Sequence, residues 1–148
     1  MVHAGKVQRL REGSFGFLIQ TSARRIDAEM KKQLVEHNID IKIFANLMML
    51  AEEDGINQRQ LGKKLGYPEY FTSRNIDALV ESGFAERQPD PQSRRSFLIF
   101  LTTKGREKAA ELPAIIQACN DIFLAPLSKT ERVAIIALLQ KVAEIEPN

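Results

Sequence analysis

The side chains best suited to chemistry in this sequence are arginines and hydroxyl groups in its middle third. One group shares a single predicted helix: Tyr70, Ser73 and Arg74. A second group flanks a proline-rich segment, residues 88–93: Arg87, Arg94 and Arg95. Guanidinium groups donate to guanine acceptors and to phosphate oxygens, and hydroxyl groups bond to phosphates or to base edges. These residue types favour binding of a polyanion over catalysis.

The distribution of charge agrees with this placement. The chain has 148 residues and a formal net charge of +2, and residues 57–106 hold nine Lys and Arg against five Asp and Glu. The preceding segment has eight basic and eight acidic residues, and the following one has four and six. An ordinary solvated surface can give the same totals, so charge alone leaves polyanion binding open.

The sequence lacks the residue sets that are typical of enzymes and metalloproteins. Cys119 is the only cysteine, and His3 and His37 are the only histidines. They cannot form a disulfide within the chain or a Cys/His zinc cluster. Neither histidine lies near a nucleophile, a glycine-rich phosphate loop or paired carboxylates in the sequence. We therefore expect no catalytic activity, no cofactor and no bound metal.

Composition and hydrophobicity indicate the class of protein. Hydrophobic residues make up 44% of the chain, charged residues 27% and aromatic residues 7%, as in ordinary globular domains. The first 15 residues lack the apolar core of a secretory signal, and no stretch approaches the ~18 apolar residues of a membrane span. We expect residues 1–148 to form one cytoplasmic unit without membrane contact.

Apolar spacing and capping signals predict the elements that carry the arginines. Apolar residues three and four positions apart predict a long helix over 15–37, and a second, buried helix covers 41–51. Asn57 begins a short helix that ends near Gly66, and Pro68 opens another that ends at Gly83. Residues 84–101 then predict a β-hairpin with a polar, basic tip.

Two further helices are expected after the hairpin. Thr102 is suited to cap a fifth helix, which Pro113 should kink or interrupt. Ser128 and Glu131 have the spacing of a capping box that opens the last helix. Two short helices followed by a hairpin, between long amphipathic helices, predict a mainly α fold of the α+β winged helix-turn-helix class with about six helices.

The terminal helices suggest how the chain assembles. Their apolar stripes are larger than so short a chain can cover by itself, which favours a symmetric homodimer. We assign residues 41–102 to a winged helix-turn-helix part and residues 12–37 and 103–146 to a helical dimerisation part.

From Asn57 to Gly105 the sequence resembles the multiple-antibiotic-resistance regulator (MarR) family of bacterial transcription factors. The helix-turn-helix positions are Gln60-Leu61-Gly62, Leu65-Gly66, Ser73-Arg74, Ile76-Asp77, Leu79, Gly83-Phe84 and Glu86-Arg87. The wing positions are Ser93-Arg94-Arg95, Ile99, Leu101-Thr102 and Gly105. The resemblance implies a dimer that binds double-stranded DNA at pseudo-palindromic operators. It also implies modulation by a small-molecule effector, often an aromatic or phenolic acid, in a pocket between the dimer helices and the winged part.

Two positions depart from the family pattern. Ser93 stands where the family usually has an acidic residue that holds a wing arginine, so we expect a less rigid wing. Residues 67–71 are bulkier than the small polar residues usual at the front of the recognition helix. The operator sequence therefore cannot be copied from relatives.

We predict a set of DNA-contacting residues in the recognition helix, at its neighbour and in the wing: Gln58, Tyr70, Ser73, Arg74, Asn75, Arg87, Arg94 and Arg95. Thr72, Ile76 and Leu79 should form the buried face of the recognition helix and turn Arg74 outward as the main base-reading residue. The alternative for Arg74 is a solvated arginine, or one paired with Asp77 or Asp90.

The wing arginines have two explanations. Arg95 matches the family's wing arginine, and a guanidinium at a hairpin tip is suited to the narrow, electronegative minor groove. Charged hairpin tips also protect edge strands and keep proteins soluble. The neighbouring helix-turn-helix favours the first explanation.

Effector and redox sites have weaker signals. His37, Phe44 and Met48 could line an effector pocket, although core packing of Phe44 and Met48 and a surface position for His37 are the favoured explanation. Cys119 could sense oxidants, but free cysteines are usually buried and inert. The peroxide-sensing branch of the family uses a cysteine near the N-terminus, which this chain lacks.

A second function of a different class also fits the fold. A helical protein-interaction module could keep the winged architecture and lose specific DNA binding, as Ser93 and the bulky turn would allow. Arg74, Arg94 and Arg95 argue against it. Steep salt dependence distinguishes DNA binding from apolar docking.

Overall fold

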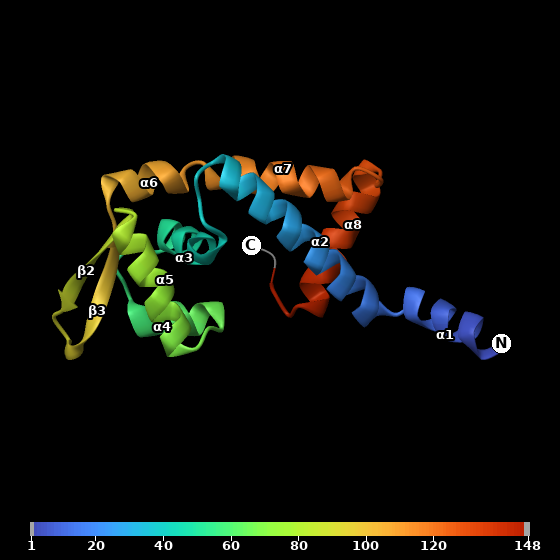
Figure 1. Ribbon diagram of the computed structural model, residues 1–148, viewed down its shortest axis with the longest axis horizontal. Helices are drawn as coiled ribbons and strands as arrows, with labels where there is room; N and C mark the ends of the chain where they lie inside the picture. Colours follow the sequence, from blue (N-terminus) through green and yellow to red (C-terminus); the bar gives the residue numbers. More distant parts are fainter. Residues whose placement is uncertain (1, 147–148) are drawn as a thin grey trace.

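The computed structural model describes residues 2–146, and Figure 1 shows an elongated molecule with the β-hairpin at one end and the N-terminus at the other. The helices before the hairpin are α1 (Val2–Glu12), α2 (Phe15–Glu36), α3 (Ile41–Glu52), α4 (Gln58–Leu65) and α5 (Glu69–Glu81). The helices after it are α6 (Thr103–Ala109), α7 (Leu112–Leu124) and α8 (Lys129–Val142). Helix α7 packs along α2, and α3 packs between α5 and α6. The mainly α, winged class is therefore confirmed.

Three predicted helix starts have the expected caps. The Asn57 side chain accepts a hydrogen bond from the Arg59 amide, and the Thr102 side chain accepts one from the Gly105 amide. At α8 both bonds of the capping box are present between Ser128 and Glu131. Each cap satisfies amides that the helix itself leaves unpaired, so these short polar residues define where the chain enters each helix.

The expectation of about six helices needs two corrections. Residues 2–12 form α1, which precedes the predicted long helix and is set off from it by Gly13 and Ser14. The predicted fifth helix is two helices, because the chain leaves α6 after Ala109 and α7 starts with Pro113 in its first turn. Proline is accepted there because first-turn amides have no partner within the helix.

The hairpin belongs to a three-stranded antiparallel sheet. Strands β2 (Ala85–Asp90) and β3 (Ser93–Leu101) form the predicted wing, and β1 (Ile56–Asn57) pairs with the other side of β3. Ile56 lies opposite Ile99, and Arg87 lies opposite the same residue on the other edge. The sequence signals missed β1 because a strand of two residues has no alternation to detect. It anchors the hairpin to the start of α4.

The buried core lies under the wing and between α2, α3, α5 and α7. Its fully buried large members include Leu34, Ile43, Leu47, Leu50, Leu61, Ile76, Leu79, Ile99 and Ile115. Gly105 marks its tightest point, because a Cβ there would lie 1.9 Å from the Phe84 carbonyl oxygen. This glycine lets the first turn of α6 approach the backbone of Phe84, which directly precedes β2.

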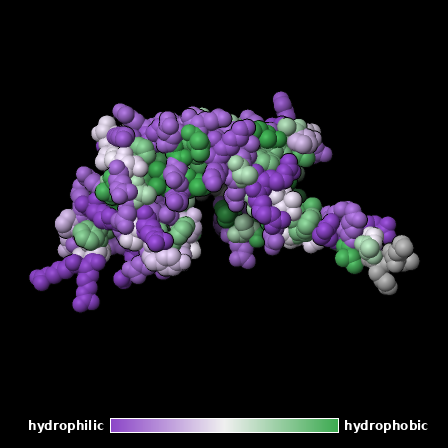
Figure 2. Space-filling model, viewed as in Figure 1, coloured by the Kyte–Doolittle hydropathy of each residue, from purple (hydrophilic) through white to green (hydrophobic). Residues whose placement is uncertain are grey.

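Much of the apolar surface of the terminal helices remains exposed. None of the residues of α8 is buried, and its exposed side chains include Val133, Ile136, Leu138 and Val142. Phe15 and Leu18 are exposed at the start of α2. Figure 2 shows hydrophobic surface in the half of the molecule that holds α2, α7 and α8. Over residues 2–146 no helix is long and apolar enough to cross a membrane.

Candidate nucleic-acid interface

The outward face of α5 carries the predicted contact residues. Thr72, Ile76 and Leu79 are buried, as their spacing predicts. The opposite side leaves Tyr70 70% exposed, Arg74 exposed and Ser73 half-buried. Helix α5 begins at Glu69, directly after Pro68, so these polar side chains lie in its first two turns. The recognition-helix geometry expected from the sequence is therefore present.

Asn75 is a wrong assignment. It is only 4% exposed and belongs to the buried face of α5, beside Ile76 and one turn before Leu79. A residue three positions after Thr72 lies on the same side of a helix as Thr72. Its amide therefore cannot reach a ligand on the outer face while the core stays packed.

Arg87 also has a different place from the one predicted. It lies on β2, away from the hairpin tip, and its side chain is 25% exposed. Its guanidinium donates to Asp77 Oδ1 at 2.6 Å, to Gln58 Oε1 at 3.2 Å and to the Ser73 carbonyl oxygen at 3.5 Å. Arg87 therefore joins the wing to α4 and α5, and the Gln58 amide oxygen is used in the same network.

The hairpin tip is held by Asp90, a residue that the sequence suggests only as a possible partner of Arg74. Asp90 accepts hydrogen bonds from the Gln92 amide, from Ser96 Oγ at 2.9 Å and from Asn57 Nδ2 at 3.0 Å. The Gln92 amide, followed by the Ser96 hydroxyl and the Asn57 amide, holds the pKa of Asp90 below its ordinary value. Asp90 thus ties the tip to the first turn of α4, although Ser93 lacks the acidic group usual at its own position.

Arg94 and Arg95 follow this anchored turn. Both are exposed. Within residues 2–146 neither of them, nor Arg74, has a hydrogen bond or ion pair from its side chain. The pairings of Arg74 with Asp77 or Asp90 that the sequence left open are therefore not made. Figure 2 shows hydrophilic side chains projecting from the end of the molecule that carries the wing.

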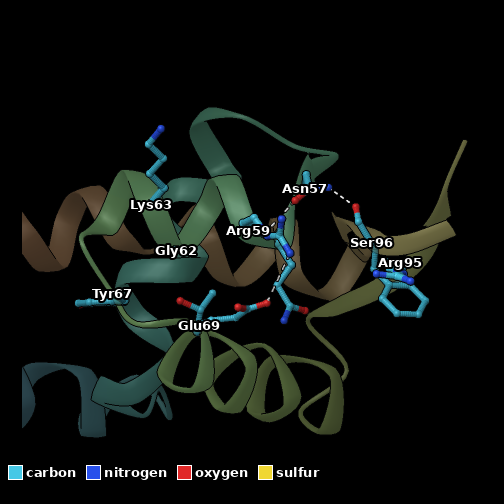
Figure 3. Close-up of a pocket in the computed structure, with 11 residues that line it drawn as sticks. Asn57, Arg59, Gly62, Lys63, Tyr67, Glu69, Arg95 and Ser96 are labelled. Atoms are coloured by element: carbon cyan, nitrogen blue, oxygen red, sulfur yellow. Dashed lines mark hydrogen bonds and ion pairs between the residues drawn. The ribbon is translucent and has the colours of Figure 1, made fainter. Parts of the chain in front are cut away.

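A cleft of about 350 Å³ lies between the wing and the starts of α4 and α5 (Figure 3). Its lining includes Arg59 and Lys63 from α4, Tyr67 and Glu69 at the start of α5, and Arg95 from β3. Arg59 and Glu69 form a loose ion pair at 4.0 Å across it. The cleft brings the recognition helix and the wing arginine to one surface.

The predicted effector residues lie elsewhere, where α2, α3 and the α6–α7 junction meet. Phe44 and Met48 are half-buried and pack against the core. His37 Nδ1 lies 2.9 Å from Glu111 Oε2, and Lys108 Nζ lies 3.0 Å from Glu111 Oε1. Hydrogen bonds from Lys108 and His37 lower the pKa of Glu111. An effector pocket formed by these residues stays a prediction.

The single cysteine is isolated from solvent. Cys119 is fully buried on α7, and burial, followed by the nearby Glu29 charge, raises the pKa of its thiol. A raised pKa lowers the fraction of reactive thiolate at neutral pH. Among residues 2–146 no three His, Cys, Asp or Glu side chains are grouped as metal ligands.

Comparison with known proteins relates this geometry to one family. A family model described as the MarR family matches residues 44–96. A MarR transcriptional regulator from Methanosarcina mazei Go1 is similar in structure, with 31% identity, coverage of 87% of this chain and 93% of that one, and a TM-score of 0.82. The uncharacterized HTH-type transcriptional regulator YkoM of Bacillus subtilis is 30% identical, over 72% of this chain and 69% of its own.

One similar structure contains nucleic acid. The transcriptional repressor CouR, solved bound to a 23-mer DNA duplex, has 23% identity to this chain and a TM-score of 0.82. The match covers 90% of this chain and 95% of CouR. At this level of identity the likeness shows a common fold.

Proposed function

This chain belongs to the MarR family of transcriptional regulators, and we propose that it acts as a homodimer on pseudo-palindromic DNA. In this proposal α5 enters the major groove, and the β2–β3 wing reaches the adjacent minor groove. The family is one of transcriptional regulators, and the proposed function involves no catalysis. Its place of action is the cytoplasm, where the DNA of a bacterial cell lies.

The observation that carries the proposal is the combination of Arg74, Arg94 and Arg95, all exposed and without acidic partners in the described chain. Other arginines of the winged part have such partners: Arg59 pairs with Glu69, and Arg87 with Asp77. Unpaired guanidinium groups on a helix and on a neighbouring hairpin suit duplex DNA, a polyanion whose major and minor grooves lie next to each other. The structure of CouR bound to a DNA duplex, which has the same fold, supports DNA as the ligand.

Within this interface we propose distinct roles for the predicted residues. Arg74 contacts base edges, with Tyr70 and Ser73 at neighbouring bases or phosphates. Arg94 and Arg95 contact the backbone and the minor groove. Gln58 and Arg87 position the wing against α4 and α5, because they bond to each other and Arg87 also bonds to Asp77.

The homodimer is supported by the apolar surface of the terminal helices. Phe15, Leu18, Val133, Ile136 and Leu138 are large side chains that water would otherwise surround. We propose that residues 12–37 and 103–146 pair with those of a second copy, which leaves residues 41–102 for DNA. A two-fold axis then places two α5 helices about one DNA turn, ~34 Å, apart. The mass of one chain is 16.7 kDa, and light scattering after gel filtration should give twice this value.

Fluorescence anisotropy tests the DNA-binding proposal directly. Purified protein is titrated into labelled DNA from upstream of its own gene and into a scrambled duplex, over a series of salt concentrations. Sequence preference together with a steep loss of affinity with salt would support a specific regulator. Equal, weak and salt-insensitive association with both duplexes would contradict it and favour the protein-interaction alternative.

Arg74→Ala tests the assignment of the base-reading residue. Losing a bidentate contact to guanine should cost about 1–3 kcal/mol in each half-site, roughly 2–6 kcal/mol for the dimer on the preferred duplex, and much less on the scrambled one. Preference at one position in each half-site should therefore relax. An equal loss on both duplexes would show that Arg74 contacts only the DNA backbone.

We further propose that a small aromatic or phenolic acid modulates binding near His37, Phe44 and Met48. His37 lies at the α6–α7 junction, where it bonds to Glu111, and Phe44 and Met48 of α3 pack partly buried against the core. Thermal shift against a panel of such acids tests the idea. A ligand that stabilises the protein and weakens DNA binding should lose both effects in Phe44→Ala, and unchanged effects would place the site elsewhere.

A further inference from the structure

One acidic side chain lies on the surface that the proposed function gives to DNA. Glu69 is the first residue of α5 and lines the cleft beside Arg59, Lys63 and Arg95 (Figure 3). Its side chain is 79% exposed, and its one ion pair within residues 2–146 is the 4.0 Å contact to Arg59. Among the basic side chains that line this cleft, Glu69 carries a carboxylate that DNA phosphates would repel.

A carboxylate on such a surface is compatible with DNA only if it meets a hydrogen-bond donor. In the major groove guanine presents two acceptors and thymine presents an acceptor and a methyl group. Adenine presents a donor with an acceptor next to it, whereas cytosine presents its amino group alone. Ionised carboxylates only accept hydrogen bonds, so cytosine is the base that suits Glu69 best.

We propose that Glu69 determines specificity by accepting a hydrogen bond from the exocyclic amino group of a cytosine, once in each half-site. The inference rests on the proposed function, because it requires α5 to lie in the major groove. Residues at the start of a recognition helix commonly reach base edges. Glu69 stands at that start, one turn before Ser73 on the outward side.

Arg59 has a separate role in this arrangement. Its side chain is 81% exposed, and an ion pair as open and as long as that with Glu69 is weak in water. In free protein the pair keeps the carboxylate over the cleft. When DNA arrives, Arg59 can exchange this partner for a phosphate, which leaves Glu69 to the base.

A purely structural role for Glu69 has a different signature. An acidic residue in the first turn stabilises a helix through its dipole. That effect changes the unfolding temperature and leaves base preference unchanged. Base preference, measured position by position, therefore separates the two roles.

The test is selection of bound duplexes from a randomised library, followed by sequencing, for wild type, Glu69→Ala and Glu81→Ala. Glu81 is a matched control because it is an exposed glutamate at the other end of α5. Wild type should prefer cytosine at one position of each half-site. Glu69→Ala should lose that preference by about fivefold or more and keep the others. Glu81→Ala should select the wild-type sequence.

Arg59→Gln completes the design by separating the two partners of the ion pair. It should weaken binding to all duplexes and keep the cytosine preference. If Arg59→Gln relaxes the same position as Glu69→Ala, Glu69 acts only through Arg59 and the inference is wrong. The inference is also wrong if Glu69→Ala keeps the preference for cytosine, or if it relaxes the preference at a position where wild type selects another base. If wild type selects no sequence at all, the proposed function itself fails.

Discussion

Replacement of Arg95 by glutamine tests whether the wing touches DNA. Arg95 is exposed, has no ion pair within residues 2–146, and lines the same cleft as the start of α5. Glutamine keeps most of the length and polarity of the side chain and removes its charge. Since no internal bond is lost, any change in DNA binding reports on the contact between this guanidinium and the DNA.

The expected magnitude follows from counterion release and from the two-fold symmetry of the proposed dimer. Each phosphate that a protein neutralises on B-DNA contributes about −0.9 to the slope of log affinity against log salt. A dimer carries two copies of Arg95, so Arg95→Gln should make the slope shallower by about 1.8. Between ~50 and ~200 mM salt, wild type should therefore lose about 12-fold more affinity than the variant.

Anisotropy titrations over at least four salt concentrations measure these slopes. Arg9→Gln is the control, because Arg9 is an exposed arginine of α1, outside both the winged part and the dimerisation part. Its slope should equal that of wild type. If the slope for Arg95→Gln equals the slopes of wild type and of the control, the wing does not contact DNA. A change in slope of about 0.9 would mean that one wing of the dimer is engaged.

Three further outcomes follow from packing and ionisation. Gly105→Ala places a methyl group against the Phe84 carbonyl and should cost about 1–3 kcal/mol in chemical unfolding, whereas Gly5→Ala, with open space around it, should not destabilise. Similar midpoints for both variants would contradict the close approach. Cys119 should react with a thiol reagent only after denaturation, because it is buried and its pKa is raised; rapid labelling of native protein would show that α7 opens. The pKa of Glu111 is lowered in the folded protein, so its ionised form stabilises the fold above about pH 4.5, and this contribution is lost as the pH falls through the folded value. Wild type and Glu111→Gln should therefore differ in unfolding free energy at neutral pH and converge in acid, and a difference that persists at pH 3 would point to packing instead.

The features that sequence predicts well here are those decided within a few residues. Caps at Asn57, Thr102 and Ser128 depend on a side chain and an amide two or three positions away. The break at Pro113 follows from the missing amide of proline. The buried face of α5 follows from helical spacing. The spacing does not show how wide this face is, and the structure includes Asn75 in it rather than among the DNA-contacting residues.

The features that sequence misses depend on partners far along the chain. Arg87 bonds to residues 10 and 29 positions away, so no local pattern distinguishes it from Arg94. Asp90 reaches Asn57 across 33 positions. Strand β1 exists because β3 offers a free edge beside Ile56, and two residues carry no periodic signal. Tertiary contacts of this kind also decide which charged groups remain available to a ligand.

The hydrogen bonds that Asp90 and Arg87 make from the wing both end at the start of α4, on Asn57 and Gln58. These two contacts explain how the interface keeps its shape. Asn57 caps α4 and holds the wing tip through Asp90, while Gln58 holds the base of the wing through Arg87, which also bonds to Asp77 on α5. Two adjacent residues that belong to neither element, together with the direct bond between Arg87 and Asp77, therefore hold the wing against the recognition helix. Backbone elements held by packed and bonded neighbours lose less conformational entropy when their side chains bind. We therefore propose that α4 holds the backbones of α5 and of the wing in one arrangement, so that the exposed arginines of α5 and β3 reach the same duplex.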